Sequence, residues 1–432
     1  MLNIDYADLV YLANADGEFN IAARYWDGRL DLVIGDDGIE LLLDNGHIAG
    51  FAKPGSFGTD ARRIRISAAE ADWAKLLESE PPPGWHNVGT AFGFTIEGNI
   101  LDRGPYYAAI RRLIELMREQ VSGPTVIRAV PDVDRSHDDA IGRYIYVDIQ
   151  GVQYRIYYEE TGSGIPLVLQ HTAGTDGRQW RHILEDRHYQ RDFRMISYDL
   201  PYHGKSVPPT SVRWWAQEYV LTKTFLMDAV VAISEAIGLD RPVFMGCSIG
   251  GELAPDLAFY HPDEFRSVIG INSTLDVEHP PYTKEVDTSD QAPYSQVHSW
   301  FHPRVASDWK ASSMLGNMAP TSPEAYQRET AWLYSQGAPP VFTGDAIFYL
   351  HGHDLTAEQA RQIDTSRVDV YLLTGEYDPL ALNGGSEKLA ACISGSHFQL
   401  IPGAGHFAPS DNPEAFKAAL DPVMKEIAAK YQ

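Results

Sequence analysis

From residue 143 onward, short apolar runs alternate with longer amphipathic segments, and this alternation constrains the fold more than any other feature of the chain. Helices are expected from about 178, over about 214–237, from 249 and from about 413. The runs predicted as strands between them are 165–170, 195–200, 242–247, 266–272, 370–374 and 398–401. Strands that alternate with helices form a parallel sheet covered on both faces. The pattern therefore predicts an α/β domain, preceded by an antiparallel strand pair at 143–148 and 152–158.

The alternation stops between residues 274 and 365, a stretch rich in Trp, Tyr, Pro and His. An insertion of this length between two core strands is too long for a plain loop. We therefore expect a helical cap over the carboxyl edge of the sheet.

The first part of the chain follows a different pattern. Apolar and polar residues alternate between 18 and 66 around two turn pairs, Asp37-Gly38 and Asn45-Gly46, which predicts a small antiparallel sheet. After Pro105, apolar residues recur at the spacing of one helix face. They are Ile110, Leu113, Ile114 and Met117. This part is expected to be a small α+β domain.

A chain of 432 residues exceeds the usual size of one domain, so at least two are expected. We predict the small α+β domain over 1–121, a polar linker over 122–142, and the α/β domain with its cap over 143–432.

A serine flanked by small residues ends the run at 242–247. Gly246-Cys247-Ser248-Ile249-Gly250 fits the G-x-S-x-G turn between a strand and a helix, where glycines remove side chains that would clash. Serine is a poor nucleophile unless an adjacent base, itself oriented by an acid, activates it. Asp378 follows one strand and His406 follows the next. We predict a catalytic triad of Ser248, His406 and Asp378.

Other residues compete for these roles. Glu376 stands two residues before Asp378, and Asp276 follows the preceding strand, so either could supply the acid. We interpret His171 and His203 as structural.

The stretch His351-Gly352-His353-Asp354 contains residue types that commonly bind metal ions. Serine chemistry needs no metal, however, and no third ligand is evident in the sequence. We interpret these four as solvent-facing residues of the cap and expect neither a metal nor a cofactor.

Together these motifs resemble the α/β-hydrolase superfamily over residues 143–432. The order Ser, Asp, His is that of the superfamily. The stretch 199–206 is similar to its D-x-x-G-x-G-x-S turn, with Tyr202 and His203 in place of the first glycine and the residue after it.

The stretch Gln170-His171-Thr172-Ala173-Gly174 is similar to the His-Gly oxyanion loop of that superfamily, except that Thr172 stands where the loop usually has glycine. The resemblance implies an oxyanion hole made by the backbone N–H groups of Ala173 and Ile249. Arg178 and Gln179 follow this loop. They are expected to hold it, or to contact a substrate carboxylate.

The resemblance implies a serine hydrolase that cleaves a carboxylic ester through an acyl-enzyme on Ser248. The substrate is expected to be a small hydrophobic or aromatic ester, because the cap is rich in aromatic residues. At least half of these residues are expected to form the core of the cap itself. Trp300 and Trp332 are the candidate substrate contacts, among Phe301, Trp309, Tyr334, Phe342, Phe348 and Tyr349.

Two other functions stay open. The same triad could cleave a carbon–carbon bond in ring-fission diketones, and a protein of this fold without enzymatic activity would bind a lipid or another ligand. The serine at 248 argues against the dehalogenase and epoxide-hydrolase branches of the superfamily, whose ester intermediate forms on a carboxylate.

The segments 17–46 and 93–99, followed by a closing helix, resemble the sterol-carrier-protein-2 fold over about 110 residues. That resemblance implies an apolar tunnel for lipids or fatty acyl groups. The domain is expected instead to pack against the cap, to narrow the entrance to the site, or to mediate self-association as a homodimer.

Charge and composition narrow the partners. With 59 Asp and Glu against 35 Lys and Arg, the net charge is −24, which disfavours nucleic acids and anionic membranes because both need a basic face. No run approaches the ~18 apolar residues of a membrane span, and the first residues carry acids where a signal peptide would carry lysines. The two cysteines, Cys247 and Cys392, are too few for a disulfide framework. We expect a cytoplasmic protein.

Overall fold

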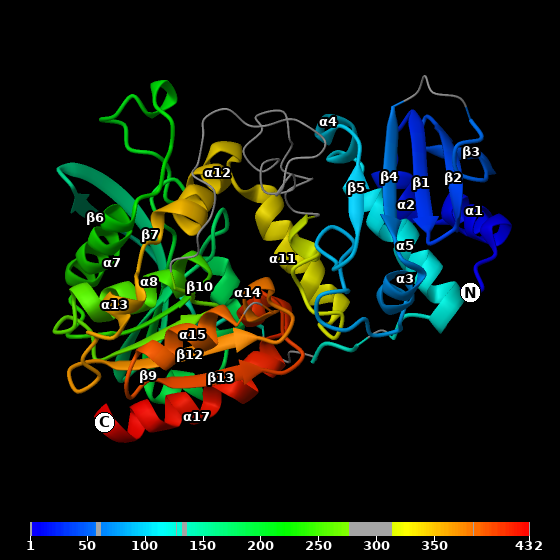
Figure 1. The fold of residues 1–432 in the computed structure, drawn as a ribbon. Coiled ribbons are helices and arrows are strands. Elements are labelled where there is room, and N and C mark those ends of the chain that lie inside the picture. Colours follow the sequence, from blue (N-terminus) through cyan, green and yellow to red (C-terminus); the bar gives the residue numbers. More distant parts are fainter. Residues whose placement is uncertain are drawn as a thin grey trace. The chain divides into compact units, whose positions relative to one another are not determined.

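The computed structural model describes residues 2–57, 62–126, 128–131, 136–275, 313–382 and 384–431. The chain divides into two compact units, Met1–Ile127 with Thr283–Gly316 and Arg128–Tyr282 with Asn317–Gln432. Each unit has its own sheet (Figure 1). The expected residues Asp276, Trp300, Phe301 and Trp309 lie outside the described ranges.

The first unit packs helices against a five-stranded sheet of order β3-β2-β1-β4-β5. Its strands are β1 (Gly28–Ile34), β2 (Asp37–Asp44), β3 (His47–Ala52), β4 (Arg63–Ala68) and β5 (Thr95–Glu97). Its helices are α1 (Tyr6–Ala15), α2 (Gly17–Ala22), α3 (Glu70–Leu76), α4 (Ile100–Arg103) and α5 (Tyr107–Ser122). The apolar face predicted for α5 is buried, with Ile110, Leu113, Ile114 and Met117 in the core.

Parts of the pattern expected for this unit are wrong. Residues 17–22 form α2 rather than strand, because the Asp16 side chain caps that helix by accepting from the N–H of Phe19 at 2.7 Å. Strands β1 and β4 pair in parallel, so the sheet is mixed. The β1–β2 turn lies at Gly35-Asp36, and Asp37-Gly38 already belongs to β2. The turn at Asn45-Gly46 is confirmed.

The second unit is built on an eight-stranded sheet of order β13-β12-β11-β10-β8-β9-β7-β6. From β13 to β9 all neighbours are parallel, whereas β7 runs antiparallel to β9 and to β6. The expected α/β class, with an antiparallel pair at its start, is confirmed. The strands are β6 (Ile141–Ile149), β7 (Val152–Gly162), β8 (Ile165–Gln170), β9 (Phe193–Tyr198), β10 (Val243–Cys247), β11 (Ser267–Ile271), β12 (Asp369–Gly375) and β13 (His397–Ile401).

The helical segments of this unit follow the strands as expected, with one late start. The helix expected over 214–237 begins as α7 (Lys223–Ile237), because the Thr222 side chain caps it by accepting from the N–H of Phe225 at 3.2 Å. The others are η1 (Gly177–Trp180), α6 (Arg181–Leu184), η2 (Tyr189–Arg191), η3 (Trp214–Ala216), α8 (Ile249–Tyr260), α11 (Glu324–Gln336), α12 (Pro339–Ile347), η4 (Phe348–Gly352), α13 (Ala357–Ala360), α14 (Pro379–Leu382), α15 (Gly385–Cys392), α16 (Ala408–Asp411) and α17 (Pro413–Tyr431).

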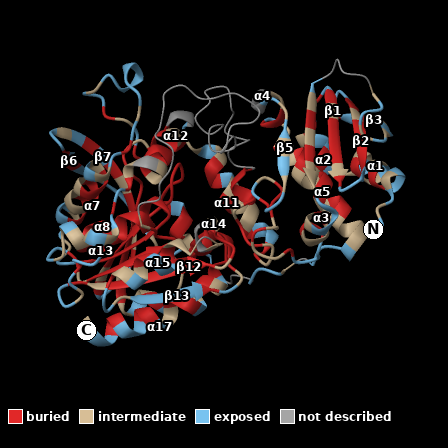
Figure 2. Ribbon diagram, in the orientation of Figure 1, coloured by how far each residue is buried: buried red, intermediate tan, exposed pale blue. Residues whose placement is uncertain are grey.

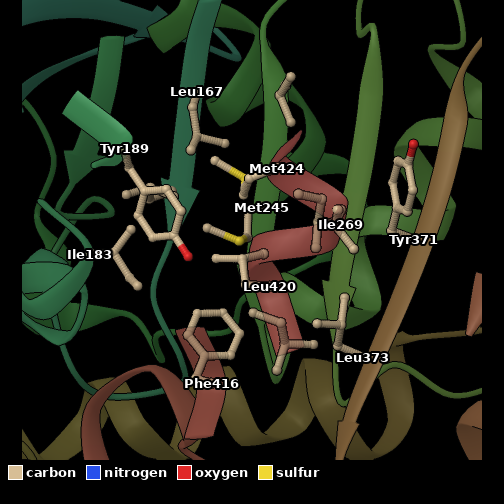
Figure 3. Close-up of a cluster of buried hydrophobic side chains, with 14 of the residues drawn as sticks. Leu167, Ile183, Tyr189, Met245, Ile269, Tyr371, Leu373, Phe416, Leu420 and Met424 are labelled. Atoms are coloured by element: carbon tan, nitrogen blue, oxygen red, sulfur yellow. The ribbon is translucent and has the colours of Figure 1, made fainter. Parts of the chain in front are cut away.

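One face of this sheet is covered by α17 together with α6 and η2. Phe416, Leu420 and Met424 of α17 pack against Met245 of β10 and Ile269 of β11 (Figure 3). Burial of each such side chain contributes about 1.5 to 3 kcal/mol relative to leaving it exposed. Figure 2 shows the resulting buried centre of the sheet. This packing fixes the strands, and with them the loops at the strand ends.

The described part of the insertion is helical. It contains α11, α12, η4 and α13, which we call the cap helices. Within the described ranges, none of the helices combines the length and the apolar character that crossing a lipid bilayer demands.

Candidate active site

Ser248 lies in a strained turn between β10 and α8, with φ of 58° and ψ of −113°. A side chain at Gly246 would begin 2.4 Å from the backbone of Gly250, and one at Gly250 would begin 2.7 Å from the Gln170 side chain. The glycines are therefore required for the close approach of strand and helix. The N–H of Ser248 donates to the Ile271 carbonyl at 3.0 Å, which ties the turn to β11.

The structure brings together the three side chains predicted as a triad. Nε2 of His406 lies 2.9 Å from Oγ of Ser248, and Nδ1 of His406 forms a short hydrogen bond with the Asp378 carboxylate. Asp378 is fully buried, while Ser248 and His406 retain 4% and 8% exposure. With Nδ1–H donating to the carboxylate, Nε2 is the ring nitrogen that is free to accept the hydrogen bond from the Ser248 hydroxyl.

Asn272, which the sequence analysis did not single out, holds the His406 loop. Its Nδ2 donates to the His406 carbonyl at 2.7 Å, and its Oδ1 accepts from the N–H of Gly375 at 3.0 Å. The N–H of His406 donates to the Asn317 carbonyl at 2.8 Å. The sequence signal for Asn272 is a polar residue at the end of the predicted strand 266–272.

The competing acid, Glu376, has a different partner. Its carboxylate accepts from the N–H of Gly403 at 2.9 Å and so shapes the turn that leads to His406. Cys247, next to the serine, is buried. Burial, and after it the charge of Asp378, raises the pKa of the Cys247 thiol well above its usual value, which keeps the thiol protonated.

Side-chain oxygens hold two backbone amides of the loop after β8. The N–H of Thr172 donates to Oε1 of Gln179 at 2.8 Å, and the N–H of Gly174 donates to Oδ2 of Asp345 at 2.7 Å. Between them, the N–H of Ala173 donates to none of the described residues, and the same holds for the N–H of Ile249 at the start of α8. These are the two amides that the sequence analysis assigned to the oxyanion hole.

The side chains of Arg178 and Trp332, the described candidates for substrate contact, make no hydrogen bond to the triad residues. The Arg178 guanidinium donates to Asp176 at 2.8 and 2.6 Å and to Oε1 of Gln336 at 2.7 Å. It lines a pocket of about 240 Å³ whose lining residues include Lys205 but none of the triad. Trp332, on α11, is 61% exposed. Contact of Arg178 or Trp332 with a substrate stays a prediction.

The interpretation of the His351–Asp354 stretch as solvent-facing is wrong for His353, which is buried against α8. Its Nδ1 lies 3.2 Å from the Asp256 carboxylate, and its Nε2 lies 3.0 Å from the Glu252 carboxylate and 2.9 Å from the Thr274 carbonyl. All of these partners are acceptors, so both ring nitrogens must donate and the ring is an imidazolium.

The charge of His353 follows from its neighbours. Burial alone would lower the pKa of His353, but the Glu252 and Asp256 carboxylates outweigh it and raise the pKa well above its usual value. Among the residues with described positions, His, Cys, Asp and Glu side chains form no group of three suited to hold a metal ion.

Comparison with known proteins agrees with the fold of the second unit. A family model for the alpha/beta hydrolase fold matches residues 165–413. The chain belongs to the α/β-hydrolase family. The resemblance inferred from the motif order is thereby confirmed for this region. The likeness of residues 1–121 to the sterol-carrier-protein-2 fold stays a prediction.

Individual relatives match this chain over only part of their length. The chain is 27% identical over 176 residues to the rat bifunctional epoxide hydrolase 2, covering 40% of this chain and 30% of that protein. It is 27% identical over 137 residues to the 2-hydroxy-6-oxononadienedioate/2-hydroxy-6-oxononatrienedioate hydrolase of Burkholderia vietnamiensis, covering 31% and 44%. The aligned segments thus span less than half of either relative.

Among solved structures, a thermophilic esterase from Thermogutta terrifontis superposes with a TM-score of 0.55 at 18% identity. The match covers 66% of this α/β-hydrolase and 99% of the esterase. At this identity the likeness concerns the fold and not the substrate.

Proposed function

We propose that the protein is a serine hydrolase that cleaves a carboxylic ester, with a small hydrophobic or aromatic substrate, through an acyl-enzyme on Ser248. The observation that carries the proposal is the hydrogen-bonded series from Oγ of Ser248 to His406, at 2.9 Å, and on to the buried Asp378. A serine at the strained turn gains nucleophilicity only from such a base.

In the proposed first half-reaction, Oγ of Ser248 attacks the ester carbonyl carbon while its proton moves to Nε2 of His406. Asp378 stabilises the imidazolium that forms. The negative oxygen of the tetrahedral intermediate accepts hydrogen bonds from the N–H groups of Ala173 and Ile249, each worth about two to three powers of ten in rate. The carbon–oxygen bond of the ester then breaks, and the alcohol leaves with the proton from His406.

In the second half-reaction, water takes the place of the alcohol. The oxygen of this water attacks the acyl carbon while His406 accepts a proton from the water. The N–H groups of Ala173 and Ile249 again stabilise the tetrahedral intermediate. Collapse returns the proton to Ser248 and releases the acid. The chain's own residues supply every proton transfer in this scheme.

A second candidate is hydrolysis of a carbon–carbon bond in ring-fission diketones with the same three residues. The similarity to the Burkholderia vietnamiensis hydrolase favours it. Epoxide hydrolysis is not carried over from the rat relative, because position 248 is a serine and the epoxide-hydrolase branch forms its ester intermediate on a carboxylate.

A substrate panel tests these candidates. Purified protein is incubated with p-nitrophenyl esters of rising chain length, aryl esters, lactones and ring-fission diketones, and a fluorophosphonate probe is used to label Ser248. Turnover of esters with labelling of Ser248 supports the ester hydrolase. Loss of diketone colour without ester turnover decides for the second candidate. Retention of a ligand without turnover or labelling would favour a binding protein.

A further inference from the structure

Asp345 on cap helix α12 is a fully buried carboxylate that the proposed reaction does not use. It accepts three hydrogen bonds from three separate segments. Oδ2 accepts from the N–H of Gly174 and from Nε2 of His203, both at 2.7 Å, and Oδ1 accepts from the hydroxyl of Tyr219 at 3.0 Å. A buried carboxylate with this many donors is an organising point for the segments that supply them.

The charge of this cluster follows from its hydrogen bonds. Nδ1 of His203 lies 2.9 Å from the Pro201 carbonyl and Nε2 faces Asp345, so both nitrogens donate and the ring is an imidazolium. Burial alone would lower the pKa of His203, but the Asp345 carboxylate outweighs it and the pKa is raised. His203 and Asp345 therefore form a buried, hydrogen-bonded ion pair.

The neighbouring His171 is neutral. Its Nδ1 donates to the Thr172 carbonyl at 2.8 Å, and its Nε2 accepts from the N–H of Leu200 at 3.1 Å. Burial, and then the positive charge of His203, lowers the pKa of His171 to about 4. With this tautomer, His171 can hold the Thr172 carbonyl without adding charge to the loop.

These contacts determine where the N–H of Ala173 points. The peptide unit between Thr172 and Ala173 is planar and trans, so its carbonyl and its N–H point in opposite directions. The carbonyl accepts from Nδ1 of His171 and from the Thr175 hydroxyl, at 2.8 and 3.1 Å. The peptide units on either side are held through the N–H of Thr172 by Gln179 and through the N–H of Gly174 by Asp345.

We propose that Asp345 is a positioning residue for the oxyanion hole: by holding the N–H of Gly174, it keeps the N–H of Ala173 directed into the site. The inference rests on the proposed function. Asp345 acts through the loop, because the three groups that it holds belong to Gly174, His203 and Tyr219 and not to the triad. Because Asp345 belongs to the cap, the completeness of the oxyanion hole depends on how α12 is seated.

A second cap residue contacts the same loop. The Tyr334 hydroxyl on α11 lies 2.7 Å from Oγ1 of Thr172. Gly174 itself has φ of +68°, and a side chain there would begin 2.7 Å from the Phe342 ring of α12. The loop is therefore fitted to the cap by shape as well as by hydrogen bonds.

The test compares three variants with the wild type on a p-nitrophenyl ester that the wild type hydrolyses. Asp345→Ala removes the acceptor of the Gly174 N–H and is expected to lower kcat about 10- to 100-fold with KM changed less than about threefold, because a misplaced oxyanion donor acts only in the transition state. Asp345→Asn keeps an oxygen that can accept from Gly174 and is expected to retain kcat within about fivefold. Tyr219→Phe removes the third donor to the same carboxylate without touching Gly174, and kcat should stay within about twofold.

A second readout separates positioning from a merely structural role. A trifluoromethyl ketone forms a hemiketal whose oxyanion occupies the oxyanion hole, so its inhibition constant should rise in Asp345→Ala by about the factor lost from kcat. If Asp345→Ala does not fold, Asp345→Ser replaces it, since its shorter side chain cannot span to Gly174. Unchanged kcat in folded Asp345→Ala, an unchanged inhibition constant, or an equal loss in Tyr219→Phe would overturn the proposal. Failure of the wild type to turn over any ester would instead contradict the proposed function.

Discussion

Two regions of the second unit build the site in different ways. The sheet carries the groups proposed to react, because Ser248, Asp378 and His406 lie just beyond the carboxyl ends of β10, β12 and β13. The cap helices carry groups that hold loops, among them Asp345. The difference teaches that the sheet topology brings the reacting groups together, whereas polar contacts from the cap set the orientation of the surrounding peptide units.

If this division holds, substitutions at the strand ends should have the largest effects. Ser248→Ala removes the proposed nucleophile and is expected to lower kcat for ester hydrolysis by about four to six powers of ten. Steady-state rates measure this loss. Cys247→Ala is the matched control, because it changes the adjacent buried side chain and should leave kcat within about tenfold. If Ser248→Ala still hydrolyses esters, Ser248 is not the nucleophile, and the strand ends do not carry the reacting groups.

The next largest loss of kcat is expected for substitution of the proposed acid, Asp378. Asp378→Asn keeps the size of the side chain but favours the wrong His406 tautomer, and kcat is expected to fall by about 10⁴-fold. Glu376→Gln is the matched variant, since this carboxylate contacts the N–H of Gly403 and not the imidazole. A larger loss of kcat in Glu376→Gln than in Asp378→Asn would assign the acid to Glu376.

The same division explains how much could be predicted from the sequence. Strand–helix alternation locates the carboxyl ends of parallel strands, which meet at one edge of the sheet, so the triad residues and the oxyanion amides could be proposed from local motifs. Asp345 and Gly174 are 171 residues apart, and neither lies in a motif that mentions the other. Such a contact exists only after folding.

The error at His353 has the same cause. The composition of residues 351–354 is typical of a solvent-exposed loop. Glu252 and Asp256, the partners that bury His353, lie one turn apart on α8, about 100 residues earlier in the chain. The late start of α7 has a local cause. The composition of residues 214–222 does not exclude a helix, but the Thr222 side chain caps α7 and so sets its first residue at Lys223. Polar groups buried by a distant segment are therefore what sequence patterns describe least well.

The buried cluster of His353, Glu252 and Asp256 predicts a change of intermediate size, in stability rather than in rate. The groups that face His353 are Glu252 and Asp256 on α8, with Lys223 3.8 Å from Asp256 and paired with Asp354. The folded pKa of His353 lies above its unfolded value of about 6.5, so its stabilisation is complete below that pH and is lost as the pH rises through the folded value. Thermal unfolding should therefore show falling stability on the alkaline side, by up to about 3 to 5 kcal/mol.

Two variants sharpen this prediction. Glu252→Gln removes one carboxylate, so it should lower the folded pKa of His353 and move the loss of stability to lower pH. His397→Gln is the control, because it changes an exposed histidine 3.8 Å from Glu426, a surface pair expected to contribute less than about 1 kcal/mol to stability. A wild-type melting temperature that stays flat between pH 7 and pH 10 would contradict the assignment of an imidazolium.

The smallest effect on the kinetic constants is expected for substitution of Trp332. The prediction compares Trp332 with Tyr334, which lies on the same helix, α11. Trp332 is 61% exposed on α11, whereas Tyr334 is buried and bonded through its hydroxyl to Thr172. Substitution of an exposed side chain usually changes stability by less than about 0.5 kcal/mol. Trp332→Ala should therefore fold normally, and it should leave kcat/KM within about twofold where the ring makes no contact with the substrate. Tyr334→Phe removes the hydroxyl that contacts Thr172 and should reduce kcat more. If Trp332→Ala instead raises KM for long-chain p-nitrophenyl esters and not for short ones, Trp332 contacts the substrate as the sequence predicted, and the cap contributes to specificity as well as to loop orientation.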